Sequence, residues 1–570
     1  MNKNYFVLCL FISLFIVGCE RDSTPSSVAE VPEQAQTCAD EKAVIVPNLG
    51  DYGRDIHSAL PQAQAYFDQG LRLTFSYYFP EALASFDAAL CFDPLNPMIH
   101  WGRALAIAPN PNSRYGGVPD DPEGEGWNAI QQAQRLAAAN PIADVDQGLI
   151  NALAVLFSDQ DGLNELEARN FTFIGATTAL YQLYPQDLEV AFLAADAIMM
   201  ATPWQYFSTV DGSAINGADK ARRYLETGIE QNPMHPGLNH LHIHLMENSF
   251  SPEAAETSAD RLESLTPIAG HMVHMPGHIY MRLGRYADSI ATNQRSLAAD
   301  KNFAAAWGEL TFPSGATYGL SHRVHAPHAQ NFIHWGAVLQ GNSELALATI
   351  QPMAEGIGAE RLESGGAQRT IANYWMTLGF FQRWQDILDL KIPEDWPPYL
   401  QGIYQFVQGS AYANTNRLAA GRAAHEKLAE ILTDPRLVNQ RASVNLATDL
   451  LQIAQHLLAG DIARSENNLE QAVTSYQLAV AAQDNLRYME PPDWLQSTRL
   501  SLGNAYLDAE NYTAAEFIFT EDLALLRENG WALYGLLQSL QSQNLAEEIE
   551  QVAERFGKAW QYADVDLGSF

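Results

Sequence analysis

Apolar residues recur along most of this chain with the spacing of about 3.6 residues that is typical of amphipathic helices. Proline and glycine interrupt this pattern at intervals, and no stretch alternates between apolar and polar residues as a half-buried strand does. Two segments differ from the rest. The stretch from Tyr5 to Val17 is almost continuously apolar, whereas residues 20–55 have no helical period. The pattern predicts an all-α fold over residues 56–570.

An internal repeat is clearest at the start of this helical region. Small and large residues follow one another there in a fixed order: Tyr66, Gly70, Leu73, Ala82, Phe86, Ala89 and Pro94. These residues match, without a gap, the small and large positions of the 34-residue tetratricopeptide repeat (TPR), and weaker copies surround Gly277, Gly460 and Gly503. The resemblance implies a superhelical solenoid of roughly ten to twelve helical hairpins, whose first helices line a concave groove.

The N-terminal segment has the features of a secretion signal. Lys3 supplies a positive charge, and the apolar stretch that follows is too short to span a bilayer. It ends in Ile16-Val17-Gly18-Cys19, which resembles the bacterial lipobox, in which the cysteine is lipidated and becomes the mature N-terminus. We therefore predict a lipoprotein signal peptide at residues 1–18, lipidation of Cys19 and a flexible tether at 19–55. An ordinary signal peptide with a chance cysteine is the alternative.

The residues around the predicted anchor also bear on the compartment. Glu20 follows the cysteine in place of Asp, so the inner-membrane retention signal of enteric bacteria is absent. We expect an outer-membrane location facing the periplasm. In that oxidising compartment Cys38 and Cys91 either form a disulfide between the tether and the first repeat or remain two separate thiols. The sequence leaves both states open.

Charge narrows the range of partners. Asp and Glu number 67 against 33 Lys and Arg, so the net charge at pH 7 is −34. Such an acidic surface repels phosphate backbones and anionic lipids, which argues against nucleic acid and against membrane contact other than the lipid anchor. It also favours the capture of cations. No nucleophile elbow, phosphate-binding loop or dinucleotide fingerprint indicates another catalytic class.

Histidine is concentrated in one part of the chain, where eleven of the fifteen lie between His235 and His334. Aligning the repeats at about residues 185–345 places several of them on the helix positions that face the groove. These candidate metal ligands are His240, His244, Glu247, His271, His274, His278 and His328. Asp196 falls on the same face one repeat earlier, and His242 falls on the opposite side, where a structural role is expected. His322, His325 and His334 lie nearby, but the repeat phase assigns them no position.

Imidazole and carboxylate groups are common ligands of transition metals, and helical pairs spaced by three or four residues present two donors to one ion. The sequence therefore predicts a groove site for Zn, Fe or Cu, with one or two ions. If the protein is an enzyme, Glu247 or Asp196 is the candidate general base beside a metal-activated water or oxygen. Two alternatives stay open: a groove that binds an acidic ligand or peptide without metal, and a structural role for these polar residues.

The histidine-rich segments also resemble a bacterial family of TPR lipoproteins with the motifs HxxxHxxE and HxxHxxxH. The resemblance is carried by His235-Pro-Gly-Leu-Asn-His240 and by His274-Met-Pro-Gly-His278-Ile-Tyr280, and it extends over nearly the whole mature chain. It implies the fold and the histidine motifs but no particular activity. Two functions follow from the sequence. One is a lipid-anchored periplasmic metalloprotein, either an enzyme or a metal carrier, and the other is an envelope scaffold that grips a partner peptide without catalysis.

Overall fold

The computed structural model describes Met1 and residues 33–112, 119–157, 166–308 and 321–567. The predicted signal peptide at 1–18 and the predicted lipidation site Cys19 lie outside these residues. Within the described ranges the regular elements are helices, apart from two isolated bridges, so the all-α prediction is confirmed. None of the helices in these ranges is long and apolar enough to cross a membrane.

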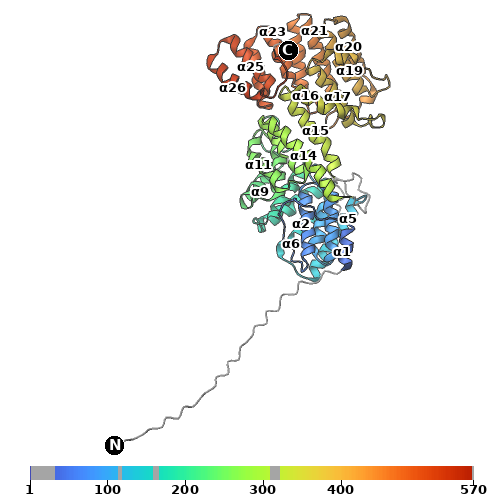
Figure 1. Cartoon of the computed structure of the whole chain (residues 1–570), viewed down its shortest axis with the longest axis vertical. Helices are drawn as coiled ribbons and strands as arrows, with labels where there is room; N and C mark the ends of the chain where they lie inside the picture. Colours follow the sequence, from blue (N-terminus) through green and yellow to red (C-terminus); the bar gives the residue numbers. More distant parts are fainter. Residues whose placement is uncertain (2–32, 113–118, 158–165, 309–320, 568–570) are drawn as a thin grey trace.

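The N-terminal part consists of sequential helices that pack against their neighbours in the chain (blue to cyan in Figure 1). They are α1 (Glu33–Asp40), α2 (Pro61–Phe75), α3 (Phe79–Phe92), α4 (Pro97–Ile107), α5 (Pro122–Ala139), α6 (Asp144–Phe157), α7 (Leu166–Leu183) and α8 (Leu188–Ala201).

The middle part carries the histidine motifs and lies between the two ends of the molecule (green in Figure 1). Its helices are α9 (Ala218–Gln231), α10 (Pro236–Met246), α11 (Glu256–Leu265), α12 (Gly270–His274), α13 (Pro276–Leu283), α14 (Tyr286–Trp307) and α15 (Ser321–Leu339). A short 3₁₀ helix, η2 (Pro252–Ala255), precedes α11.

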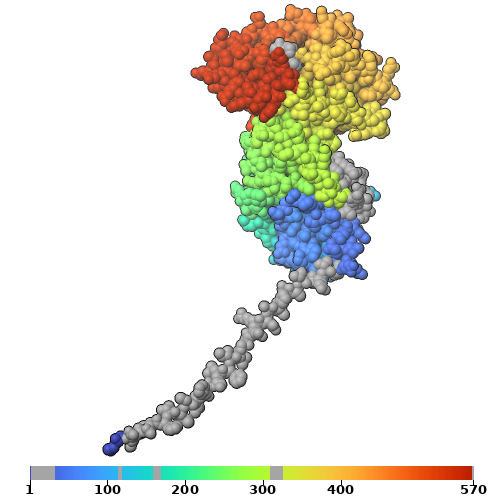
Figure 2. Space-filling view, in the orientation of Figure 1, coloured from blue at the N-terminus to red at the C-terminus, as the bar shows by residue number. Residues whose placement is uncertain are grey.

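The C-terminal part is stacked on the middle part along the long axis of the molecule (yellow to red in Figure 2). Its helices are α16 (Ser343–Glu355), α17 (Gly365–Phe380), α18 (Trp384–Asp389), α19 (Pro398–Asn414), α20 (Leu418–Ile431), α21 (Ala447–Ser465), α22 (Leu469–Asp484), α23 (Thr498–Asp508), α24 (Tyr512–Leu525), α25 (Gly530–Gln543) and α26 (Ala546–Ala559). The 3₁₀ helices η3 (Ala359–Arg361) and η4 (Pro435–Leu437) lie in its connections.

Glycine–aromatic pairs hold the helices of a hairpin together. A Cβ atom at Gly70 of α2 would lie 2.7 Å from the ring of Phe86 in α3. The same test gives 2.4 Å between Gly460 and the Tyr476 ring and 2.4 Å between Gly503 and the Phe519 ring. Because the small residue lets the helices approach and the large ring fills the space between them, these pairs account for the repeat pattern. The chain is an array of TPR-type hairpins, as the repeat predicted.

Most hairpins reverse direction through one residue in the left-handed backbone region. That residue has φ of +76° at Gly284, +69° at Gly341, +59° at Asn416 and +60° at Asn467. Glycine and asparagine tolerate this conformation better than other residues. Three hairpins place a larger residue at this position: Tyr77 between α2 and α3 with φ of +61°, Gln382 with +54° and Glu510 with +55°.

Within the segment 19–55 that the sequence predicts to be a tether, the described residues 33–55 contain the helix α1 and make contacts with later helices. A disulfide joins Cys38 of α1 to Cys91 of α3, which is one of the two states that the sequence allowed. Residues 43–56 are here called the N-terminal strap. They run alongside α2, and the backbone N–H of Val46 donates to Gln69 Oε1 of that helix at 2.7 Å. The sequence of the strap has no helical period, and its position depends on such hydrogen bonds and on scattered buried side chains.

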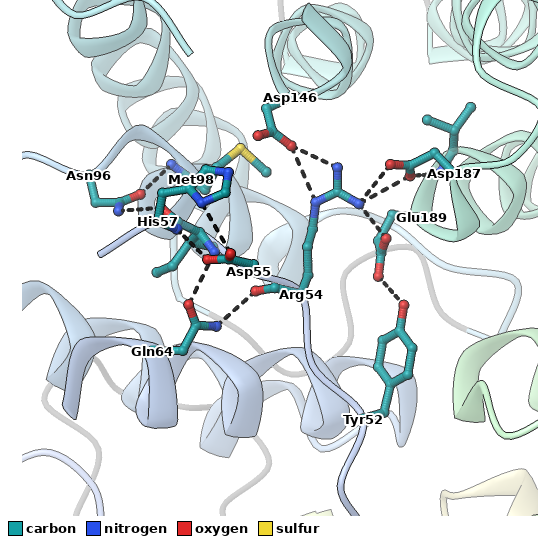
Figure 3. A network of polar contacts seen from close by, with 12 residues as sticks. Tyr52, Arg54, Asp55, His57, Gln64, Asn96, Met98, Asp146, Asp187 and Glu189 are labelled. Carbon is teal, nitrogen blue, oxygen red and sulfur yellow. Dashed lines mark hydrogen bonds and ion pairs between the residues drawn. The ribbon is translucent and has the colours of Figure 1, made fainter. Parts of the chain in front are cut away.

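Arg54 fastens the strap to two later helices (Figure 3). Its guanidinium lies 2.7 Å from Asp146 of α6, 2.9 Å from Asp187 and 2.5 Å from Glu189 of α8. Tyr52 donates a further hydrogen bond to Glu189. A guanidinium carries five N–H donors in one plane, so a single arginine satisfies all three carboxylates.

Candidate metal centre

Four helices bring the predicted histidine ligands together in two groups of three. The first histidine group comes from α10 and α12 and the second from α12, α13 and α15, and the ligand nitrogens within each group lie within 4.8 Å of one another. The first group is His240, His244 and His271; the second group is His274, His278 and His328. Convergence of imidazoles from neighbouring hairpins, which the metal hypothesis requires, is therefore present.

Both groups are mostly buried: two histidines of each group are buried, and the third, His271 or His328, is half-buried. The side chains of His240, His244 and Glu247 are at most 2% exposed, and His274 is fully buried. The turn of the first hairpin and a loop from the C-terminal part cover them, through Phe75 and Glu490. α2 also packs against α10, so the first hairpin lies over part of the predicted concave surface.

The helix that carries His271, His274 and His278 is interrupted where the sequence predicts a continuous one. α12 ends at His274 and α13 begins at Pro276, whose ring cannot continue the hydrogen-bond ladder. Met275 between them nevertheless keeps helical angles, with φ −51° and ψ −38°. The side chains of His274 and His278 therefore still project to one side.

A backbone carbonyl and a side-chain amide orient two of the rings. His240 Nδ1 lies 2.7 Å from the carbonyl oxygen of Phe75, and His274 Nδ1 lies 2.6 Å from Asn293 Oδ1. The Asn293 amide is fixed in this orientation because its Nδ2 donates to the Ser289 carbonyl at 2.8 Å. Both oxygens only accept, so each Nδ1 must donate, and the lone pair of each neutral ring lies on Nε2.

Two buried carboxylates orient His244 and His278. Glu247 Oε1 lies 3.3 Å from His244 Nδ1, and Glu247 Oε2 lies 2.6 Å from His278 Nδ1. Glu490 Oε2 approaches the same His278 nitrogen at 3.0 Å. Carboxylates that accept from the far nitrogen of a histidine fix its tautomer and strengthen it as a metal ligand. Glu247, which the sequence predicts as a ligand, thus faces the Nδ1 side of two imidazoles.

The Nε2 atoms converge as a consequence. His274 Nε2 lies 2.9 Å from His278 Nε2, and His271 Nε2 lies 3.1 Å from His240 Nε2. Two lone pairs at this distance repel, so a proton or a metal ion must lie between His274 and His278. Neighbouring nitrogens on one ion are also about 3 Å apart when the metal–nitrogen bonds are about 2.0–2.1 Å. The distance within each of these two pairs of nitrogens is therefore compatible with two ligands of one ion.

The charge state of His278 differs from that of its neighbours. Burial lowers the pKa of His278, but Glu247 and Glu490 outweigh this effect and raise the pKa to about 10. Burial, followed by repulsion from other histidines, holds the pKa values of His240, His271 and His274 well below the ordinary value. His240, His271 and His274 are therefore neutral at pH 7 and offer lone pairs.

Comparison with known proteins identifies no family. No protein-family model matches the chain, and no curated protein matches it. Among solved structures, the human IFIT1 dimer with m7Gppp-AAAA is 10% identical, with 82% of this chain and 90% of that chain covered and a TM-score of 0.34. The yeast Tom70 structure is 10% identical, with 87% and 90% covered and a TM-score of 0.29. Likenesses this remote assign no function, and the resemblance to bacterial lipoproteins stays a prediction.

His325 is a member of the cluster that the repeat phase did not place. Its ring centre lies 5.2 Å from that of His271 and 4.8 Å from that of His274, between the two groups. Its Nδ1 lies 3.3 Å from Asp300 Oδ2, and Asp300 in turn accepts from the Tyr78 hydroxyl at 2.7 Å. The spacing of three residues between His325 and His328 on α15 is the signal that could have found it.

Glu490 is the residue that sequence reasoning missed without any local signal. It lies in the connection between α22 and α23, 212 residues from His278 along the chain. The side chain is 3% exposed, and burial raises its pKa despite the hydrogen bond from His278. Only the packing of the C-terminal part on the middle part brings it to the centre.

Other predicted residues lie outside the two groups. Asp196 is buried in α8 and, with Tyr77, lines a small cavity of about 20 Å³, so it does not face the converging nitrogens. His242 bonds to Ser258 Oγ at 3.0 Å, in agreement with the structural role expected for it. His334 bonds to Thr377 at 2.9 Å. The side chain of His322 lies outside the described part.

Proposed function

We propose that this protein is a metalloprotein that binds Zn, Fe or Cu through the Nε2 atoms of its two histidine groups. One observation carries the proposal: His274 and His278 face each other through Nε2 at 2.9 Å while their Nδ1 atoms donate to oxygens. A site built this way fixes each lone pair toward a common interior point before an ion arrives.

A purely structural role fits the cluster less well. The buried Nε2 atoms of His244 and His325 have no hydrogen-bond partner among the described residues. Leaving a buried polar group unpaired costs about 1–3 kcal/mol. A metal ion would remove this cost and also the charge on His278, since it would replace the proton there.

The bound ion would act as a Lewis acid or activate water or oxygen, which is the chemistry that such ions supply in proteins. The protein residues contribute orientation. Glu247 and Glu490 hold His278, Glu247 also holds His244, and Asn293 holds His274. An enzyme and a metal carrier would differ in whether one coordination position stays open.

Elemental analysis after dialysis tests this proposal. The chain from residue 20 onward is incubated with Zn²⁺, Cu²⁺ or Fe²⁺, dialysed, and its metal content is measured. We expect at least one ion per chain, lost in the double variant His271→Ala, His274→Ala. The control variant His57→Ala, His425→Ala removes two histidines outside the centre and is expected to retain the metal. Wild-type protein that binds none of the three ions would refute the proposal.

We also propose that the protein is anchored by lipid at Cys19 on the periplasmic side of the outer membrane. The lipobox-like Ile16-Val17-Gly18-Cys19 supports this proposal. Labelling of growing cells with radioactive palmitate is expected to mark the wild-type chain and not the Cys19→Ser variant. Equal labelling of both chains would contradict it.

Partner binding is the second candidate function, and a cavity of about 500 Å³ in the C-terminal part favours it. Side chains of α17, α19, α21, α23 and α25 line it, among them Asn414, Asn504 and Gln538. Such amides can pair with a peptide backbone. A wild-type protein that binds no metal but carries a stoichiometric peptide in this cavity would establish this alternative.

A further inference from the structure

An aromatic ring covers each histidine group. The ring centre of Tyr77 lies 4.6 Å from His240, 5.8 Å from His244 and 5.4 Å from His271. Phe332 covers the second group in the same way. Its ring centre lies 4.8, 4.5 and 5.1 Å from the ring centres of His274, His278 and His328. The two groups are therefore alike in their donors and in having an aromatic cover.

The two covers differ in one atom that matters chemically. The Tyr77 hydroxyl is buried and has no hydrogen-bond partner among the described residues. A buried phenol without a partner is unfavourable, because it has lost its hydrogen bonds to water without replacing them. Phe332 is fully buried and has no polar atom. Of these two covering rings, the one over the first group therefore carries a donor and the one over the second group does not.

The backbone holds Tyr77 over the first group at an energetic cost. Its φ of +61° lies in the left-handed region, as do the φ angles of Gly284, Asn416 and Gln382 in the equivalent turns of later hairpins. For a residue with a side chain this region is unfavourable, because Cβ comes close to a backbone carbonyl oxygen. The turn is fixed by the neighbouring Tyr78, whose hydroxyl accepts from the Gly270 N–H of α12 at 2.9 Å and donates to Asp300. Tyr77 is thereby kept at the centre.

We propose that the two groups hold two ions of different character, and that the ion of the first group keeps one position for a small oxygen ligand that accepts a hydrogen bond from Tyr77. Water, hydroxide and dioxygen-derived ligands share this chemistry. The ion under Phe332 receives no such bond. This inference rests on the metal binding proposed above.

Three imidazoles and one exchangeable position are the arrangement of catalytic metal sites, whereas fully protein-ligated ions are structural. A donor aimed at the exchangeable ligand in a water-poor site stabilises negative charge there more strongly than it would in water. Trp204 adds a second wall, with its ring centre 5.4 Å from that of His244. The first group thus has three imidazoles, a buried hydroxyl without a partner among the described residues, and two aromatic walls.

Azide binding to the cobalt-loaded protein tests the inference, because azide is a small anion that takes an exchangeable position and accepts hydrogen bonds. We expect two Co²⁺ per chain, with azide changing the visible spectrum of the ion of the first group at a lower concentration than that of the second. Tyr77→Phe is expected to keep both ions and to weaken azide binding by about tenfold or more, since hydrogen bonds to charged groups are the stronger kind. Tyr534→Phe, in α25, is the control and is expected to leave azide binding unchanged.

The outcomes separate the two proposals. A chain that binds no cobalt, zinc, copper or iron refutes the metalloprotein itself. If the chain binds two ions and Tyr77→Phe leaves the azide affinity unchanged, the inference is overturned but metal binding stands. The same holds if the chain binds a single ion. If Tyr77→Phe fails to fold by circular dichroism, Phe332→Tyr applies the same test in reverse. The added hydroxyl is expected to tighten azide binding at the second ion, and unchanged affinity there overturns the inference.

Discussion

Single buried carboxyl groups in this protein differ in whether a cation compensates them. Burial raises the pKa of Glu247, but the charge of His278 and hydrogen bonds from His244 and His278 outweigh burial and lower the pKa to about 2. Asp196 experiences burial alone, which raises its pKa to about 8. Two buried carboxyl groups thus have opposite charge states at pH 7. The imidazoles beside Glu247, which Asp196 lacks, account for the difference.

Asp196→Asn is expected to stabilise the protein at alkaline pH. Between about pH 4 and pH 8 the folded state keeps a proton on Asp196 that the unfolded chain has released, so stability falls as pH rises through this window. The amide removes that dependence. Urea unfolding should show a difference near zero at pH 4 and on the order of a few kcal/mol in favour of the variant at pH 9. A difference independent of pH would contradict the assignment.

Among the elements, the N-terminal strap shows how a segment without a helical period becomes ordered. It contributes few buried apolar residues, among them Val46, Leu49 and Ile56. Its position is determined by Arg54, which lies among three carboxylates from elsewhere in the chain. Removing the cation would leave those carboxylates buried and uncompensated, which costs far more than a surface ion pair is worth.

Arg54→Met is therefore expected to destabilise the protein by about 3–5 kcal/mol. The change retains most of the side-chain volume but none of the five N–H donors. Arg223→Met, which breaks an exposed pair with Asp219 (62% and 55% exposed side chains), is the matched control and should change stability by less than about 1 kcal/mol. Urea unfolding of both variants measures the difference, and equal effects would show that the strap does not depend on Arg54.

The loop that carries Glu490 is a second element placed by long-range contacts. Arg369 of α17 bonds to Asp493 at 3.2 Å and to the Pro491 carbonyl at 3.3 Å. Asp493 Oδ2 accepts from the backbone N–H of Asn445 at 3.1 Å. These bonds tie the loop to two neighbouring segments of the C-terminal part, so Glu490 is presented to His278 from a rigid support.

At the scale of the whole molecule, three distant parts of the chain meet at the metal centre. The first hairpin supplies the Phe75 carbonyl and Tyr77, the middle part supplies the histidines, and the C-terminal part supplies Glu490. An ion bound at this point would stabilise only the arrangement in which all three parts are docked. By mass action the stabilisation is about 4 kcal/mol when the free ion is at 1,000 times its dissociation constant.

Glu490→Gln is expected to weaken metal binding while leaving the ligands in place. The carboxamide has the same size but is a weaker acceptor for His278 Nδ1–H, and changes of this kind usually reduce metal affinity about 10–100-fold. Competition with a chromophoric zinc chelator measures the affinity. Glu550→Gln on the exposed part of α26 serves as the control. An affinity equal to that of the wild type would show that the C-terminal part does not contribute to the centre.

The sequence by itself determined the helices, the repeat and the set of converging histidines. Those features depend on residues three, four or a few tens of positions apart, such as Gly70 with Phe86 or His274 with His278, so they leave a periodic trace in the chain. The six predicted histidines on α10, α12, α13 and α15 are accordingly among the residues that the structure brings together, to which His325 is added. Helical geometry is a local property, and it could be predicted locally.

Tertiary structure alone decided that the centre is mostly buried, that the strap is ordered, and that Tyr77 and Glu490 belong to the site. His240 meets Phe75 across 165 residues and His278 meets Glu490 across 212. Contacts so distant in sequence follow from how hairpins dock, which no local pattern encodes. Glu247 illustrates the limit: helical spacing brought it to the histidines, but only their packing decided that its carboxylate faces Nδ1 atoms rather than the converging Nε2 atoms.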